Sequence, residues 1–130
     1  MMKTVAAAII IEGDNVLIAR RDPLQQLAGY WEFPGGKLED GESLIECLRR
    51  ELREELGVDS EPGEILAESE YHYEHGSFLL IGIYTQLKSD QLQLTVHDRI
   101  EWVPITTLLT YRLAPADIPL AKKIQEAGHV

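Results

Sequence analysis

Apolar residues recur at helical spacing between Ser43 and Leu56, and no other stretch of the chain is patterned so regularly. Ser43 is a typical N-cap residue, and Glu46 stands three positions later, where it can complete a capping box. Gly57 follows the last apolar residue, where a left-handed C-terminal cap favours glycine. We therefore predict a helix over 43–56. Its apolar stripe consists of Leu44, Ile45, Leu48, Leu52 and Leu56.

Segments with strand character lie on both sides of this helix, and turn-forming residues separate them. The strand-like segments are 3–11, 16–20, 31–33, 65–73, 78–87, 92–96 and 100–103. The turns, loops and linkers are 12–15, 22–30, 58–63, 74–77 and 88–90. A helical turn at 105–109 and a terminal helix over 115–127 complete the chain, with Pro119 in the first turn, where proline is tolerated.

This order of elements predicts one domain over residues 1–130 with both α and β structure. Strands, a long helix, more strands and a second helix are typical of a mixed sheet covered on two faces. The chain has 130 residues, which suits one compact domain. It contains no internal repeat, low-complexity tract or interdomain linker.

Three carboxylates lie beside the apolar stripe of the helix. At about 100° per residue, Glu51, Glu54 and Glu55 fall within an arc of about 100°. Like charges on one arc repel one another, so the arrangement costs stability on a bare helix. One interpretation is a solvated acidic face, since arginines are interleaved at 49, 50 and 53. The other is a cation site, and the residues before the helix favour it.

Those residues form the tight turn Pro34-Gly35-Gly36, where glycine allows close approach of a ligand to the backbone. The turn opens the pattern G-x5-E-x7-R-E-U-x-E-E-x-G-U, in which U is a bulky apolar residue. This pattern is the Nudix box, and the chain resembles the Nudix hydrolases over nearly its whole length. Every specified position is met, by Gly36, Glu42, Arg50, Glu51, Leu52, Glu54, Glu55, Gly57 and Val58.

The resemblance implies an αβα sandwich with a mixed central sheet and a Mg²⁺-dependent reaction, with Mn²⁺ as an alternative ion. It implies that Glu51, Glu54 and Glu55 are metal ligands and that one of them orients or deprotonates the attacking water. The Gly35 carbonyl is a further candidate ligand. The family adds an acidic residue from outside the box, for which Asp98 is the first candidate and Glu101 the second.

The resemblance assigns supporting roles to the other residues of the box. Arg50 can hold the carboxylates in orientation, one helical turn from Glu54, and Glu42 can pair with Arg50. We group Arg50 with the catalytic residues on this basis. Gly36, Glu42 and Gly57 are expected to be structural.

Two further stretches resemble the MutT and CTP pyrophosphohydrolase branch of the family, whose members split a nucleoside triphosphate into monophosphate and pyrophosphate. The first is Glu32-Phe33-Pro34-Gly35-Gly36, and the second is the segment 113–120, which contains Asp117. Arg21 matches an arginine of that branch. The resemblance therefore implies substrate contacts from Arg21, Glu32, Phe33 and Asp117, and a role in nucleotide-pool sanitation linked to DNA repair. Asp117 is also interpretable as a helix N-terminal carboxylate.

Composition narrows the set of partners. The net charge of −10 argues against binding nucleic acid or an anionic membrane, and a divalent cation would supply the positive charge that polyphosphate binding needs.

The apolar N-terminus is interrupted by Glu12-Gly13-Asp14, so we interpret it as a strand and not as a leader. The lone Cys47 excludes an internal disulfide and fits a cytoplasmic protein. The chain is expected to be a monomer or a homodimer.

Several alternatives stay open at this point. A Nudix-like module could sense a nucleotide without cleaving it, although sensors of that kind commonly lose box glutamates. The substrate could instead be a dinucleoside polyphosphate or a sugar nucleotide. Among nucleoside triphosphates, 8-oxo-dGTP and CTP-type nucleotides are both candidates, and the sequence does not decide which glutamate is the general base.

Overall fold

The structure is a computed structural model that describes residues 2–22 and 28–128. Most of the loop expected over 22–30 lies outside these residues. The elements follow in the order β1 (Lys3–Ile9), β2 (Ile11–Glu12), β3 (Asn15–Arg21), β4 (Trp31–Glu32), β5 (Gly35–Lys37), α1 (Leu44–Leu56), β6 (Ser60–Tyr73), β7 (Gly76–Leu87), β8 (His97–Pro104), the 3-10 helices η1 (Ile105–Thr110) and η2 (Pro115–Asp117), and α2 (Ile118–Glu126).

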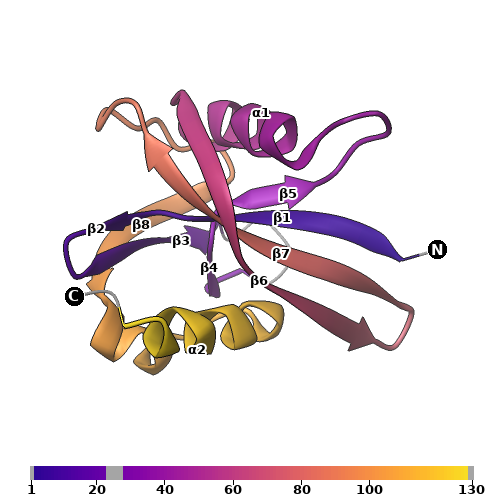
Figure 1. Ribbon diagram of the computed structural model, residues 1–130. Coiled ribbons are helices and arrows are strands. Elements are labelled where there is room, and N and C mark those ends of the chain that lie inside the picture. The colour runs from indigo at the N-terminus through magenta and orange to yellow at the C-terminus, as the bar shows by residue number, and fades with distance from the viewer. Residues whose placement is uncertain (1, 23–27, 129–130) are drawn as a thin grey trace.

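The strands form two sheets. The first has the order β5-β1-β7-β6 and is mixed, because β1 pairs parallel with β7 while its other pairs are antiparallel. In the second, β2, β4 and β8 all pair antiparallel with β3. Figure 1 shows α1 on one side of the strands and α2 on the other. The predicted mixed sheet covered on two faces is therefore confirmed.

Strand β1 is buried on both faces, which explains its unbroken apolar run. Ala6, Ala8 and Ile10 pack with α1 in one hydrophobic cluster. Ala7 and Ile9 point the other way, into a cluster that contains residues of α2. Because successive side chains of a strand alternate in direction, one short segment contributes to both cores. This is the arrangement expected of a central strand in a three-layer fold.

Helix α1 is bounded as predicted. The Ser43 side chain accepts a hydrogen bond from the Glu46 amide, and the Glu46 side chain accepts one from the Ser43 amide, which completes the capping box. Gly57 adopts the left-handed conformation at φ 63° and donates to the Arg53 carbonyl. Ile45 differs from the prediction, because it is 42% exposed and lies outside the buried stripe.

Two segments after the helix differ from the sequence interpretation. Within the linker expected over 58–63, residues 60–63 are instead the start of β6, where a bulge accommodates Pro62 on an edge strand. The prediction of a strand over 92–96 is wrong, because the backbone of this segment is hydrogen-bonded to the C-terminal end of α1. Gln93 and Thr95 donate backbone hydrogen bonds to the carbonyls of Leu56 and Glu55. No helix within 2–22 and 28–128 is long and apolar enough to cross a membrane.

Candidate active site

Arg50 is the centre of the acidic face of α1. Its Nε and Nη2 donate to the two carboxylate oxygens of Glu42, at 2.7 and 3.0 Å. Nη1 donates to Glu51 at 2.7 Å and to Glu54 at 3.4 Å, while Nη2 also reaches the Lys37 carbonyl at 3.1 Å. The Arg50 guanidinium lowers the pKa of Glu42 to about 2, and the carboxylates raise the pKa of Arg50. The pairing of Glu42 with Arg50 is as the sequence predicted.

Gly35 and Gly36, expected in a tight turn, lie instead in strand β5, which pairs with β1 and packs against this helix. A Cβ atom on Gly36 would overlap the Glu51 carboxylate, so glycine at this position lets the helix face approach the strand. Gly35 has φ 152°, and a Cβ there would overlap the Ala6 carbonyl of β1. A side chain is thus excluded at Gly35 by backbone atoms, whereas one at Gly36 would displace the Glu51 carboxylate.

The three box glutamates occupy different environments. The Glu54 side chain is 61% exposed, whereas those of Glu51 and Glu55 are only 14% and 12% exposed. Burial raises the pKa of Glu55 to about 9, with further contributions from contact with Glu51 and from the charge of Glu32, against a backbone hydrogen bond from Gly35. The Glu55 carboxyl therefore binds its proton more tightly than an exposed glutamate does.

A buried polar chain connects Glu55 with β4. Nε2 of His97 lies 2.7 Å from Oε2 of Glu32, and Nδ1 of His97 lies 4.0 Å from Oε1 of Glu55. The other oxygen of Glu32 accepts a hydrogen bond from Nε of Arg21 at 3.1 Å. The His97 side chain has no exposed surface. Sequence analysis did not single out His97 as a site residue, since a lone histidine in a strand carries no spacing signal.

Asp117 is 6% exposed, although it stands at the start of the terminal helical segment. Its Oδ2 accepts a hydrogen bond from the backbone N–H of Phe33 at 3.3 Å. Burial and the charge of Glu32 raise its pKa well above that of an ordinary aspartate. Its side chain makes no capping hydrogen bond to α2. Arg21, Glu32, Phe33 and Asp117 are thus brought together, in line with the resemblance.

Asp98, the first candidate for an acidic ligand outside the box, is paired with Arg20. Nε and Nη2 of Arg20 donate to its two oxygens, at 2.9 and 3.1 Å. The alternative candidate, Glu101, forms an ion pair with Arg99 at 3.1 Å. Because both oxygens of Asp98 are engaged by Arg20, we leave this residue out of the metal ligands proposed below. The residue of β8 that reaches Glu55 is its neighbour His97.

Carboxylate oxygens such as those of the helix are the ligand type that hard divalent cations such as Mg²⁺ or Mn²⁺ prefer. Oε1 of Glu55 is buried and finds no hydrogen-bond partner among the described residues, so this atom fits a role as a ligand. Within 2–22 and 28–128, no three side chains of ligand type already stand around one point. In this structure the carboxylates of Glu51 and Glu54 instead accept hydrogen bonds from Arg50.

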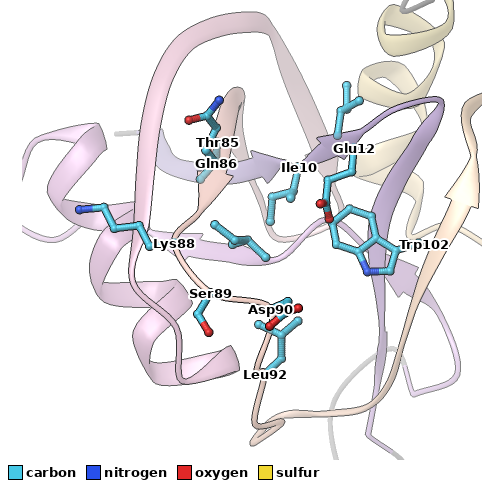
Figure 2. Close-up of a pocket in the computed structure, with 11 residues that line it drawn as sticks. Ile10, Glu12, Thr85, Gln86, Lys88, Ser89, Asp90, Leu92 and Trp102 are labelled. Atoms are coloured by element: carbon cyan, nitrogen blue, oxygen red, sulfur yellow. The ribbon is translucent and has the colours of Figure 1, made fainter.

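A cavity of about 570 Å³ lies away from these residues. Figure 2 shows Glu12 and Trp102 on one side of it and the loop from Ser89 to Leu92 on another, with Lys88 directed outward. None of the site residues named above lines it. Because no residue of the box lines this cavity, we do not assign the reaction to it.

Comparisons with known proteins identify the family. Residues 2–124 match the family description "NUDIX domain". The CTP pyrophosphohydrolase of Escherichia coli (strain K12) is 41% identical over 122 residues, covering 92% of this chain and 88% of that protein. An 8-oxo-dGTP diphosphatase of Proteus vulgaris is 50% identical over 56 residues, covering 42% and 50%. The solution structure of the E. coli ORF135 protein matches with a TM-score of 0.84 and 37% identity, covering 96% and 89%.

The chain therefore belongs to the Nudix family, as a hydrolase that retains all the glutamates of the box. The αβα sandwich expected from the resemblance is the fold observed.

Proposed function

We propose that the protein hydrolyses a nucleoside triphosphate to the monophosphate and pyrophosphate, with CTP-type and 8-oxo-dGTP-type nucleotides as the candidate substrates. The observation that carries the proposal is the continuity of the site. His97 lies 4.0 Å from Glu55 of α1 and is hydrogen-bonded to Glu32, and the amide of the next residue, Phe33, donates to Asp117. The full-length similarity to a CTP pyrophosphohydrolase supports the same substrate class.

The roles of the residues follow from their positions. A divalent cation, when bound, neutralises charge on the phosphate oxygens and lowers the pKa of a bound water. Glu51, Glu54 and Glu55 would hold it, with the Gly35 carbonyl as a further ligand. Arg50 keeps the carboxylates aligned through its contacts with Glu51 and Glu54. One of the three glutamates also removes the proton from the attacking water.

The nucleoside end of the site is formed by Glu32, Phe33 and Asp117. With its raised pKa, Asp117 keeps a proton at higher pH than an exposed aspartate, so its carboxyl can donate as well as accept a hydrogen bond. That pairing capacity resembles that of an asparagine. It suits a base edge with a neighbouring donor and acceptor, as cytosine and oxidised guanine both present. Arg21, held by Glu32, is the nearest candidate for a phosphate contact in this group.

A substrate panel tests the activity. Ordinary, oxidised and methylated nucleoside triphosphates are incubated with Mg²⁺ and, separately, with EDTA. We expect turnover with Mg²⁺ and none with EDTA. In ¹⁸O-water the label should enter pyrophosphate, because attack is expected at the β-phosphorus. Label in the monophosphate would contradict this mechanism, and binding without turnover of any nucleotide would favour a sensor instead.

A further inference from the structure

His97 is the only histidine with a fully buried side chain among the described residues. It lies at the first position of β8, which pairs with β3 in the second sheet. Its ring contacts Glu32 of β4 on one side and approaches Glu55 of α1 on the other. The ring therefore spans the space between the second sheet and the helix that packs on the first.

A β-bulge turns His97 inward. The pairing of β3 with β8 joins Arg20 to Arg99 and then Arg21 to His97, so that Asp98 has no partner residue. Asp98 forms an ion pair with Arg20, outside the site, while His97 is buried. Bulges beside functional sites commonly redirect a side chain in this way. The bulge thus provides a specific reason for a histidine to enter the site at this position.

The two ring nitrogens have different environments. Nε2 lies 2.7 Å from Oε2 of Glu32, a strong hydrogen bond. Nδ1 is buried and has no hydrogen-bond partner among the described residues, and the same holds for Oε1 of Glu55, which lies 4.0 Å away. Leaving two buried polar atoms without hydrogen bonds is unfavourable, and a small movement of the Glu55 side chain would allow Nδ1 and Oε1 to bond. Binding of a cation by Glu55 would produce such a movement.

We propose that His97 is a positioning residue that links the two ends of the site. Through Nε2 it fixes Glu32 at the nucleoside end, and through Nδ1 it supports Glu55 at the metal end. This role rests on the pyrophosphohydrolase activity proposed above. The contact with Glu32 and the support of Glu55 can therefore be separated by substitutions that each preserve only one of the two nitrogen positions of His97.

The matched pair of variants is His97→Gln and His97→Asn. The glutamine amide can reach Glu32 as Nε2 does, but glutamine has no polar atom at the Nδ1 position. The asparagine amide can replace Nδ1 but is too short to reach Glu32. Exposed His72, substituted by Gln, is the control.

Two measurements separate the two ends. Calorimetric titration with Mn²⁺ alone, without nucleotide, should show about tenfold weaker binding for His97→Gln and less than about threefold for His97→Asn. Discrimination between the best and second-best nucleotide in kcat/KM should fall by about tenfold in His97→Asn and change little in His97→Gln. Equal losses in both variants on both measurements, in proportion to a lower Tm, would overturn the proposal.

A third measurement uses the wild-type protein, so it holds even where a variant fails to fold. In ¹⁵N NMR of the histidine ring, Mg²⁺ alone should shift mainly Nδ1, and a nucleoside monophosphate in EDTA should shift mainly Nε2. If neither ligand moves the His97 resonances, the proposal is wrong. Mn²⁺ binding and these shifts do not require turnover, so a failure of the proposed activity would be recognised separately, by an inactive substrate panel.

Discussion

At the scale of single residues, the box carboxylates differ most in burial and in their partners. Glu55 is buried and its pKa is raised, whereas Glu54 is exposed and its side chain contacts Arg50 at 3.4 Å. Glu51 is held between Arg50 and Gly36 of β5. Removing any one of them should therefore affect catalysis and stability in different proportions.

Glu54→Gln should separate catalysis from folding most clearly. The substitution keeps the size of the side chain but removes a charge that binds the cation, so we expect kcat to fall by about 100-fold or more. Thermal unfolding in EDTA should change little, since the side chain is 61% exposed. Steady-state kinetics with Mg²⁺ measures the first effect. A variant that keeps a third of the wild-type kcat would remove Glu54 from the metal ligands.

Asp117→Asn tests the buried carboxyl through the pH dependence of stability. Because the pKa of Asp117 is raised in the folded state, the folded protein binds its proton more tightly than the unfolded chain does. The carboxyl therefore contributes stability below its ordinary pKa, and that contribution is lost as pH rises through the raised value. We expect the free energy of unfolding in EDTA to decline less with rising pH in Asp117→Asn than in the wild type. Identical pH profiles would show that Asp117 is not buried as described.

Asp98→Asn tests a residue that the resemblance suggested as a metal ligand. Since Arg20 engages both of its oxygens, we expect the Mg²⁺ concentration for half-maximal activity to stay within about twofold of wild type. The Tm should fall slightly through loss of the ion pair. Arg20→Gln is the control, because it breaks the same pair from the other side. A large loss of Mg²⁺ activation in Asp98→Asn alone would restore Asp98 to the metal ligands.

The pairing of Arg50 with Glu42 could be predicted because both residues have fixed places in the box. The inward position of His97 could not be predicted, because it depends on a bulge that changes the register of β3 and β8 by one residue. The burial of Asp117 was equally hidden, since its partner Phe33 lies far away in the sequence. Long-range contacts of this kind leave no periodic signal.

At the scale of elements, α1 is fixed at both ends as well as along its buried face. The capping box closes its N-terminus, and the segment over 92–96 binds its last carbonyls through Gln93 and Thr95. Thr95 Oγ1 also donates to the Glu54 carbonyl at 2.9 Å. The turn of the helix that carries Glu54 and Glu55 is therefore held in place by a segment outside the box.

Glu42→Gln tests the contact that fixes Arg50 to the start of the box. The pKa of Glu42 is lowered to about 2, so its ionised form stabilises the fold above the ordinary glutamate pKa. That contribution is lost as pH falls from about 4.5 through about 2. Urea unfolding at several pH values should show wild type more stable than Glu42→Gln near neutrality, with the difference shrinking in acid. Glu39→Gln is the control, because Glu39 reaches Arg50 only at 3.5 Å, and a constant difference at all pH values would contradict the prediction.

Helix α1 could be predicted almost to the residue because its caps and apolar period agree. The segments at 58–63 and 92–96 could not. Pro62 suggested a linker, but an edge strand tolerates proline at a bulge. The alternating pattern at 92–96 suggested a strand, but its backbone pairs with the end of the helix. In both cases tertiary hydrogen bonding outweighed the local pattern.

At the scale of the whole molecule, the excess of acidic residues makes the free protein self-repelling. Its net charge is −10, and the box adds a cluster of carboxylates close together on one helix. Monovalent salt should stabilise the fold by screening this repulsion. A divalent cation bound at the site should stabilise it further, since binding to the folded state alone shifts the unfolding equilibrium.

Millimolar MgCl₂ should therefore raise the Tm more than NaCl at matched ionic strength. The difference between the two rises in Tm should grow as pH rises toward about 9, because cation binding requires Glu55 to lose its proton, and the raised pKa opposes that loss at lower pH. Differential scanning calorimetry in both salts measures this difference. Glu55→Gln is the control, and it should keep the response to NaCl while losing the excess with Mg²⁺. If the wild type responds equally to both salts at every pH, the carboxylates of α1 do not form a specific cation site.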